Sequence, residues 1–153
     1  MTIINIRCVL TLPNAKLPHR AHEGDSGLDL YAPDVVVLSP GVPCFVDVGV
    51  VLELPVGYEG QIRSRSGLTK KGLTACSGLG TVDSSYSGSL GVTLLWHTQP
   101  GNGGEDTWTM EAGSRIAQLV IMRVPMVELV ECSWLIPSTT SRGTGGFGST
   151  DNR

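Results

Sequence analysis

A pair of arginines next to hydroxyl groups is the first feature of the sequence that could do chemistry. The segment Arg63, Ser64, Arg65, Ser66, Gly67 follows a strand-like run and opens a short helix-like one. Guanidinium groups bind phosphate through paired hydrogen bonds, and the free N–H groups where a helix begins also bind anions. The segment therefore predicts an anion site, although a capped helix with two solvated arginines would read the same way.

A carboxylate and a phenol stand three positions apart in the segment from Gly80 to Gly88, which reads G-T-V-D-S-S-Y-S-G. Asp83 is a candidate to orient and deprotonate a water molecule. Tyr86 is a candidate to pack against a sugar. The alternative for this segment is an Asx-turn at Asp83 with Tyr86 in the core.

Two acids lie close together at the start of another predicted strand. Asp25 and Asp29 belong to the run D-S-G-L-D-L. Carboxylate oxygens of this kind suit a weakly held, largely hydrated Mg2+, and the alternative is a plain surface turn. His19 and His22 precede them, but no matching Cys or His set elsewhere completes a metal site.

The C-terminal stretch, residues 138–153, has the composition of a mobile arm rather than of a core element. Its glycines leave backbone N–H groups accessible, while Arg142, Ser149 and Thr150 add donors that could wrap phosphate oxygens. Phe147 is its lone aromatic side chain, and its flat face could stack on a base. A merely flexible terminus is the alternative.

Short strands must position these groups, because the rest of the chain alternates apolar runs with Pro and Gly turns. One helix is expected, over Ser66 to Lys71. This pattern predicts an all-β domain of the sandwich, barrel or jelly-roll class. The expected strands are Ile3 to Leu12, Val35 to Leu38, Cys44 to Val48, Val50 to Leu54, Tyr58 to Arg63, Thr81 to Val82, Leu90 to Trp96, Thr107 to Met110, Arg115 to Met122 and Met126 to Val130.

Composition narrows the possible functions. A chain of 153 residues fits one domain, and 41% hydrophobic residues with only two Phe call for a core of Val, Leu and Ile. The net charge of -3 argues against a protein that coats nucleic acid. The N-terminal residues lack the long apolar run of a signal peptide or a membrane span, so we expect an intracellular protein. The four cysteines are widely spaced, which predicts buried free thiols.

Taken in order, five segments resemble the five motifs of the trimeric dUTPase family. The resemblance implies a jelly-roll-like β-clip subunit, a homotrimer with sites at its subunit interfaces, and an exchanged C-terminal arm. It divides the chain into a β domain at residues 1–137 and an arm at residues 138–153. The segments are G-D-S-G-L-D-L (Gly24 to Leu30), R-S-G-L (Arg65 to Leu68), G-T-V-D-S-S-Y-S-G (Gly80 to Gly88), R-I-A-Q-L-V (Arg115 to Val120) and R-G-T-G-G-F-G-S-T (Arg142 to Thr150).

The resemblance also implies an activity, the Mg2+-dependent hydrolysis of dUTP to dUMP and diphosphate by water attack at the α-phosphorus. Asp83 would activate the water, and Gln118 would contact the α-phosphate or that water. Asp29 would act through metal-bound water, because the substrate phosphates hold Mg2+ and no side chain binds it directly. Arg142 would pair with the γ-phosphate.

Substrate-binding residues follow from the same resemblance. Arg65, Ser66 and Gly67 would hold the phosphate chain, and Tyr86 would leave no room for a ribose 2′-hydroxyl. Backbone groups between Ser77 and Val82 would read uracil and exclude thymine. The remaining contacts would come from Gly80 in that hairpin and, in the arm, from Gly146, Phe147, Gly148, Ser149 and Thr150.

Some positions depart from the usual family pattern. Ser77 stands where many members have Asn, so the side-chain contact to the base is open, and Trp96 also falls where an Asn is common. The loop at residues 99–106 looks longer than in compact members and is where an unknown regulatory partner could bind. The alternatives are a dCTP deaminase, whose catalytic Glu is replaced here by Thr93, a dUTP-sensing regulatory module, or a structural jelly roll.

Overall fold

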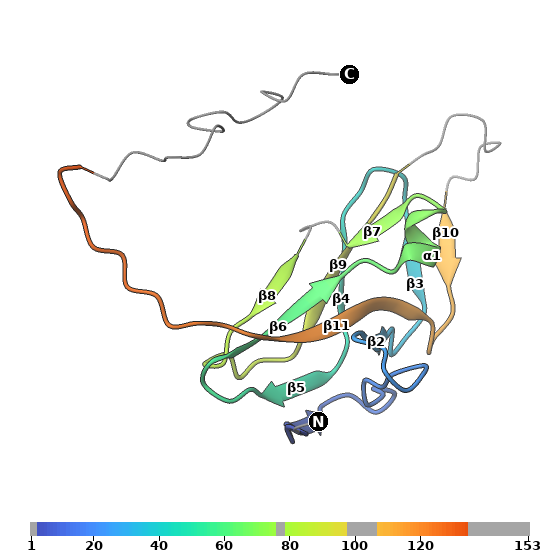
Figure 1. Ribbon diagram of the computed structural model, residues 1–153. Helices are drawn as coiled ribbons and strands as arrows, with labels where there is room; N and C mark the ends of the chain where they lie inside the picture. The colour runs from blue at the N-terminus through green and yellow to red at the C-terminus, as the bar shows by residue number, and fades with distance from the viewer. Residues whose placement is uncertain (1–2, 76–78, 98–106, 135–153) are drawn as a thin grey trace.

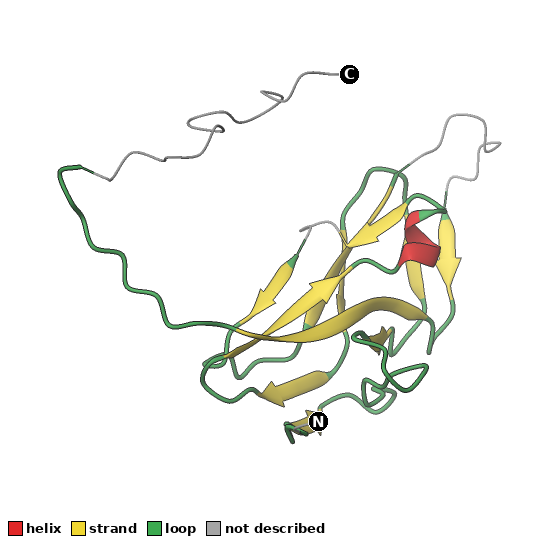
Figure 2. Cartoon of the chain, viewed as in Figure 1, coloured by secondary structure: helices red, strands yellow, loops and turns green. Residues whose placement is uncertain are grey.

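The computed structural model describes residues 3–75, 79–97 and 107–134. In these ranges the protein is nearly all β, with one short helix (Figure 2). Figure 1 shows the elements in order: β1 (Arg7–Leu10), β2 (Leu28–Tyr31), β3 (Val36–Leu38), β4 (Cys44–Asp47), β5 (Val50–Glu53), β6 (Tyr58–Arg63), α1 (Ser66–Thr69), β7 (Leu73–Ala75), β8 (Gly80–Val82), β9 (Gly91–Trp96), β10 (Trp108–Met110) and β11 (Arg115–Arg123).

The strands form because β-branched and aliphatic residues alternate with polar ones between turn residues. In β9, for example, Val92 and Leu94 are buried, while Gly91, Thr93 and Leu95 on either side of them are partly exposed. The inward side chains meet in one core that lies between the sheets and is built almost entirely from Val, Leu and Ile. The side chains that are most completely enclosed are Leu30, Leu38, Leu73, Leu90, Leu94, Ile116 and Leu119.

A four-stranded antiparallel sheet in the order β2-β11-β6-β8 carries most of the candidate chemistry. Within it, Gln118 of β11 lies opposite Asp29 of β2 on one side and opposite Arg63 of β6 on the other. A three-stranded sheet β4-β9-β7 and the pairs β1-β5 and β3-β10 complete the described part of the fold. Three of the motif segments therefore meet at one end of the four-stranded sheet.

The predicted fold class is confirmed, and most strands begin and end within a few residues of their expected positions. The first strand is shorter than expected, because pairing with β5 covers only Arg7–Leu10. The expected strand at Met126 to Val130 is wrong for this chain. After Val124, whose N–H donates to Gly57 O at 2.9 Å, the chain leaves the body as an extended segment (Figure 1). Its side chains are exposed, and a strand needs a ladder partner that one chain does not offer there.

The cysteine prediction holds in part. Cys8, Cys44 and Cys132 are free thiols, of which Cys8 and Cys44 are partly buried and Cys132 is exposed, while Cys76 lies outside the described residues. Burial raises the pKa of Cys8. In the part of the chain that the structure describes, no helix has the length and apolar character needed to cross a membrane.

Candidate active site

Asp29 is the centre of the candidate site. It is the buried charged residue among those described, with 9% of its surface exposed. Its two carboxylate oxygens bind different arginines: Arg65 Nε lies 3.0 Å from Oδ1, and Arg115 Nη1 lies 3.2 Å from Oδ2. A buried carboxylate is stable only when it is paired and hydrogen-bonded, and here two guanidinium groups supply both.

Arg65 is held in place by two contacts and keeps a free donor. Beyond its bond to Asp29, its Nη1 donates to the backbone oxygen of Arg115 at 3.2 Å. Its Nη2 makes no hydrogen bond to any other residue that the structure describes. The guanidinium plane is thus fixed by the protein while one edge stays available to an anion.

Arg115 is a site residue that the sequence reasoning did not assign. It stands at the start of β11, where the pairing with β2 passes from Arg115–Tyr31 to Ala117–Leu30 and leaves Ile116 as an extra residue. A β-bulge of this kind bends the strand and redirects neighbouring side chains. The lone signal in the sequence was the position of Arg115 at the head of a motif, which says nothing about its partner.

Backbone N–H groups next to Arg65 point to the same anion chemistry. Arg65 has an extended conformation and precedes α1, whose first residues are Ser66 and Gly67. The carbonyl of Arg65 accepts from the N–H groups of Leu68 and Thr69. The N–H groups of Ser66 and Gly67 have no such acceptor among the described residues, and both residues are exposed. They are therefore available to an anionic ligand.

The position of the Gln118 side chain depends on Gly27. A Cβ atom built on Gly27 would overlap Gln118 Oε1 and would lie 3.0 Å from Gln118 Cδ. Only glycine at position 27 leaves the amide of Gln118 in its present place. The G-L-D-L run thus contributes both Asp29 and the space for Gln118.

These side chains line one pocket of about 360 Å³. Its walls come from the loop before β2, from β2, from the turn into α1 and from β11. The structure therefore brings together five of the residues predicted for the site. The pocket is lined by Ala21, Asp25, Ser26, Gly27, Asp29, Arg65, Ser66, Gly67, Arg115 and Gln118.

Asp83 and Tyr86 lie outside this pocket. Tyr86 lines a second pocket of about 330 Å³, which shares no residue with the first. Tyr86 N donates to Asp83 O at 3.0 Å, and the Tyr86 hydroxyl donates to Ser89 O at 2.9 Å. These bonds hold a tight turn in which Asp83 is exposed and the Tyr86 ring is about half exposed, at 48%.

The sheet register explains this separation. Val82 of β8 pairs with Gly60, whereas Gln118 of β11 pairs with Arg63 on the other side of β6. Three residues along a strand are about 10 Å, and two strand spacings across the sheet add about 10 Å at right angles, or roughly 14 Å in all. Because β8 runs antiparallel to β6, Asp83 lies still farther from Gln118. Asp83 and Gln118 are therefore well separated within one chain.

The other predicted site residues divide into two groups. Gly80 and Val82 lie on β8, where Val82 is buried and Gly80 pairs with Ile62. Ser77 and the arm residues Arg142, Gly146, Phe147, Gly148, Ser149 and Thr150 lie outside the described residues, as does the proposed boundary at residue 137. Within the described ranges, no group of three or more His, Cys, Asp or Glu side chains is placed to hold a metal ion.

Fold and pocket together define a class, an all-β protein with a pocket at one end of its four-stranded sheet that is lined by Arg65 and Arg115, here named the anion pocket. A family model described as dUTPase matches residues 13–151. The chain belongs to the dUTPase family. A curated deoxyuridine 5′-triphosphate nucleotidohydrolase from a Picosynechococcus species is 40% identical over 96% of this chain and 99% of the relative. One from a Hydrogenobaculum species is 47% identical over 90% of this chain and 91% of the relative.

Solved structures agree in fold. A Staphylococcus bacteriophage 80alpha dUTPase with dUpNHpp superposes with a TM-score of 0.85 at 29% identity, covering 97% of this chain and 99% of that one. A mutant dUTPase of phage phi11 of S. aureus, described as revealing the coordination of a structural Mg(II) ion, has a TM-score of 0.77 at 27% identity. It covers 86% of this chain and 98% of that one.

Proposed function

We propose that this chain hydrolyses dUTP to dUMP and diphosphate. The observation that carries the proposal is the pocket in which Asp29, Arg65 and Gln118, from three separate dUTPase-like motifs, lie together. Membership of the dUTPase family supplies the substrate class. The pocket chemistry fits it, because fixed arginines and free N–H groups are suited to a chain of phosphates.

A complete site requires more than one chain. The anion pocket lies at one end of the four-stranded sheet, and Asp83 lies beyond the opposite end of β8. We propose that the chain assembles as a homotrimer in which the pocket of one subunit meets the Asp83 turn of another. Closed threefold symmetry repeats this contact three times and gives three equivalent sites.

The residues would then divide the work. Arg65, with the N–H groups of Ser66 and Gly67, would hold the phosphate chain, and Gln118 would contact the α-phosphate or the attacking water. Asp83, exposed on its turn, would accept a proton from that water as it attacks the α-phosphorus. The diphosphate would leave in line with the attack. Tyr86 would lie under the deoxyribose and exclude a 2′-hydroxyl.

Mg2+ fits this arrangement as an ion carried by the substrate. The described residues offer no three-ligand cluster, and the oxygens of Asp29 already bind two arginines. Each carboxylate oxygen can still accept a hydrogen bond from a water molecule. Asp29 would therefore reach the ion through water. Mg2+ bound to the phosphates would neutralise their charge and favour one conformation of the triphosphate.

Recognition of the base and closure of the site are proposed for the segments outside the described residues. The backbone from Ser77 to Val82 would read the uracil edge. Phe147 would stack on the base, and Arg142 would pair with the γ-phosphate. Gly146, Gly148, Ser149 and Thr150 would cap the phosphates, with residues 138–153 acting as an arm on the β domain at residues 1–137.

A substrate panel tests the activity directly. Diphosphate release is measured with dUTP, dTTP, dCTP and UTP, each with and without Mg2+. We expect rapid release from dUTP with Mg2+ and little from the other nucleotides. Equal rates with dUTP and UTP would contradict the role of Tyr86, and no release from dUTP would contradict the proposed function.

A regulatory role is a second candidate, favoured by one observation. Structures similar to this one are phage dUTPases described as controlling transfer of virulence genes. We propose residues 99–106 as the place to test for a protein partner, by pull-down with and without this segment. A dCTP deaminase is the remaining alternative, and ammonia release from dCTP would support it, although Thr93 is no proton carrier.

A further inference from the structure

The loop before β2 forms one wall of the anion pocket. Ala21, Asp25 and Ser26 line the pocket. The loop meets β2 through the backbone, because Asp29 N donates to His19 O at 2.9 Å. The position of this wall relative to Asp29 is therefore fixed close to His19.

The wall is stiff beyond that point. Arg20 Nε donates to Asp25 O at 2.6 Å, and His22 N donates to Asp25 Oδ2 at 3.0 Å. Asp25 N donates back to His22 O at 3.2 Å. Because residues 20–25 are bonded to one another, a shift at His19 moves them as a unit.

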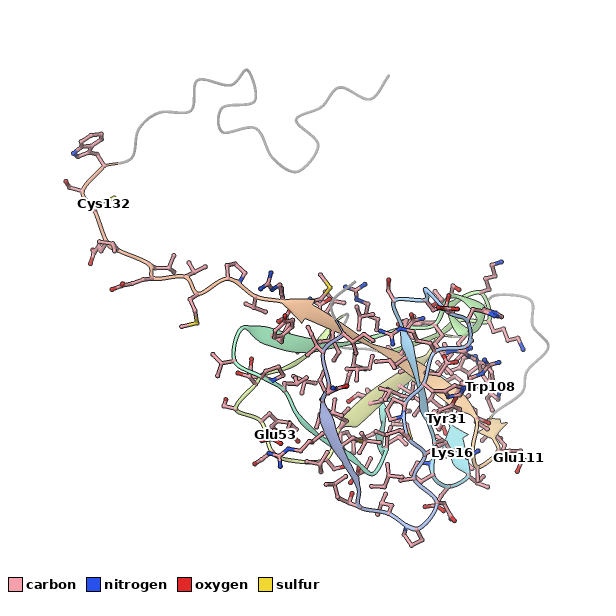
Figure 3. All side chains as sticks on the ribbon, turned by 60° about the horizontal axis from the view of Figure 1, so that its bottom comes forward. Lys16, Tyr31, Glu53, Trp108, Glu111 and Cys132 are labelled. Atoms are coloured by element: carbon pink, nitrogen blue, oxygen red, sulfur yellow. The ribbon has the colours of Figure 1, made fainter. Side chains whose placement is uncertain are left out.

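One side-chain hydrogen bond joins this loop to β2 in the described part of the chain. Tyr31 Oη and His19 Nδ1 are 2.7 Å apart, and the two rings are stacked with centroids 5.8 Å apart and an interplanar angle of 6°. Lys16 Nζ lies 5.4 Å from the centre of the Tyr31 ring, and Figure 3 shows the two side chains close together. Tyr31 thus contacts two residues of the segment before β2, Lys16 and His19.

Tyr31 is itself buried and lies close to the charges of the site. Only 9% of its surface is exposed, and its partner across the sheet is Arg115. Burial and the charge of Asp29 raise its pKa, so the phenol stays protonated. His19, in contrast, is exposed, and its ring stacks on that of Tyr31.

We propose that Tyr31 and His19 are positioning residues whose hydrogen bond sets the wall of the anion pocket and thereby its affinity for a phosphate chain. Neither side chain lines the pocket. Without this bond, the backbone bond from Asp29 N to His19 O still ties the loop to β2, but the wall is held less tightly, while Arg65, Gln118 and Asp83 are unchanged. The effect therefore falls on binding rather than on the chemical step.

The probe for this proposal is inorganic tripolyphosphate, whose affinity is measured by calorimetry on the full chain with Mg2+. Tyr31→Phe removes the hydroxyl and keeps the ring. One hydrogen bond corresponds to a loss of about threefold to tenfold in affinity. His19→Leu should lose as much, whereas His19→Asn, which keeps an acceptor where Nδ1 stands, should retain most of it. Asn14→Ala is the matched control, because it breaks a bond to Asp34 in the same N-terminal region, away from the pocket.

A second test uses steady-state kinetics with dUTP and rests on the proposed function. With dUTP, Tyr31→Phe should raise KM by about threefold to tenfold and leave kcat within about twofold, the pattern of lost uniform binding. Thermal unfolding of each variant checks that the fold is intact. The proposal is overturned if Tyr31→Phe binds tripolyphosphate as the wild type does, if His19→Asn is as weak as His19→Leu, or if the wild type does not bind tripolyphosphate. If the variants bind tripolyphosphate as expected but the protein does not hydrolyse dUTP, the result contradicts the proposed function alone.

Discussion

At the scale of single residues, Asp29 offsets part of the positive charge that Arg65 and Arg115 bring to the pocket. It balances two guanidinium groups that would otherwise repel each other, and its side chain is 12% exposed. A partly buried carboxylate in this position stabilises the fold and aims Arg65 at the same time. Its loss should therefore affect stability and activity together.

We expect Asp29→Asn to lower the free energy of unfolding by about 1–3 kcal/mol, less than for a fully buried pair because Arg115 is half exposed. Turnover of dUTP should fall as well, because Arg65 loses its fixed orientation. Chemical denaturation and steady-state kinetics measure the two effects. Asn14→Ala is the control, since it removes an exposed hydrogen bond to Asp34 that lies away from both pockets. Equal losses in both variants would contradict the role of Asp29.

Gly27 makes the position of Gln118 testable by a double-mutant cycle. Gly27→Ala places a methyl group on Gln118 Oε1, so we expect the amide to turn away, with a small loss of stability, because this end of the side chain is flexible, and a clear loss of dUTP turnover. In a Gln118→Ala background the same substitution should cost clearly less, because the overlap is gone. Additive losses in the double variant would show that Gly27 serves some other purpose.

Tyr31 gives a pH prediction. Burial first, and then the charge of Asp29, raise its pKa, while Arg115 and Arg65 act in the opposite direction. The folded protein thus holds this proton more tightly than the unfolded chain. The resulting stability is fully present below the ordinary tyrosine pKa of about 10 and is lost as pH rises through the raised folded-state value.

Unfolding free energies of the wild type and of Tyr31→Phe should therefore converge above about pH 10. Denaturant titrations at a series of alkaline pH values measure this. Parallel curves for the two proteins would mean that the titration of Tyr31 is not coupled to folding.

At the scale of elements, the turn between β6 and α1 is tied to β7. Ser64 Oγ accepts from Ala75 N at 2.9 Å, and β7 is an edge strand of its sheet. The Ser64 hydroxyl thus accepts a hydrogen bond from a backbone N–H group of the edge strand β7. Because Ser64 is next to Arg65, this bond also holds the turn that carries Arg65.

Ser64→Ala should lower the free energy of unfolding by about 1 kcal/mol, because Ala75 N–H loses its acceptor. Amide hydrogen exchange at Ala75 should accelerate in the same variant. Ser39→Ala, at an exposed serine whose backbone alone is hydrogen-bonded, is the control. Unchanged exchange at Ala75 would contradict this account of the turn.

The sequence predicted the strands better than their partners. Alternation and turn residues located β6 at Tyr58–Arg63 without error, because those are local properties of the chain. The short strand β7 was not predicted, and β2 was expected only as a strand after the turn at Asp25, without stated ends, since three or four residues carry little pattern. Met126 to Val130 has a strand-like pattern but no ladder, because pairing is a long-range property.

The residues of the candidate site also divide into those that the sequence predicted and those that depend on long-range contacts. Motif order identified Asp29, Arg65 and Gln118, and the structure brings them into one pocket. The bulge that directs Arg115 to Asp29, the space that Gly27 leaves, and the bond between Tyr31 and His19 all depend on register and packing. No spacing in the sequence encodes these contacts.

At the scale of the whole molecule, the proposed active site is shared between chains. The pocket with Gln118 and the turn with Asp83 lie apart in one chain. The extended segment after β11 is apolar and exposed, with Met126, Leu129 and Val130 among its side chains. The proposed trimer would both complete the site and cover these residues.

Removal of residues 138–153 separates assembly from catalysis. We expect the shortened chain to elute as a trimer, because the extended segment at residues 124–134 is retained, and to lose most dUTP hydrolysis, because Arg142 and Phe147 are gone. Size-exclusion chromatography with light scattering and a diphosphate assay measure the two properties. A monomeric product would contradict the view that these residues serve the site rather than the assembly.

The shared site is tested most directly by mixing two inactive variants. Asp83→Asn should lower turnover by at least about 100-fold, because general-base catalysis contributes that much. Gln118→Ala should disable the pocket of its own chain. When equal amounts are unfolded together and refolded, about one site in four of a random trimer combines an intact pocket with an intact Asp83 from a neighbour.

The account predicts that the mixture recovers about a quarter of wild-type dUTP hydrolysis, while each variant refolded alone stays inactive. Activity of the mixture no greater than the average of the two variants would show that one chain holds the entire site, and would contradict the account.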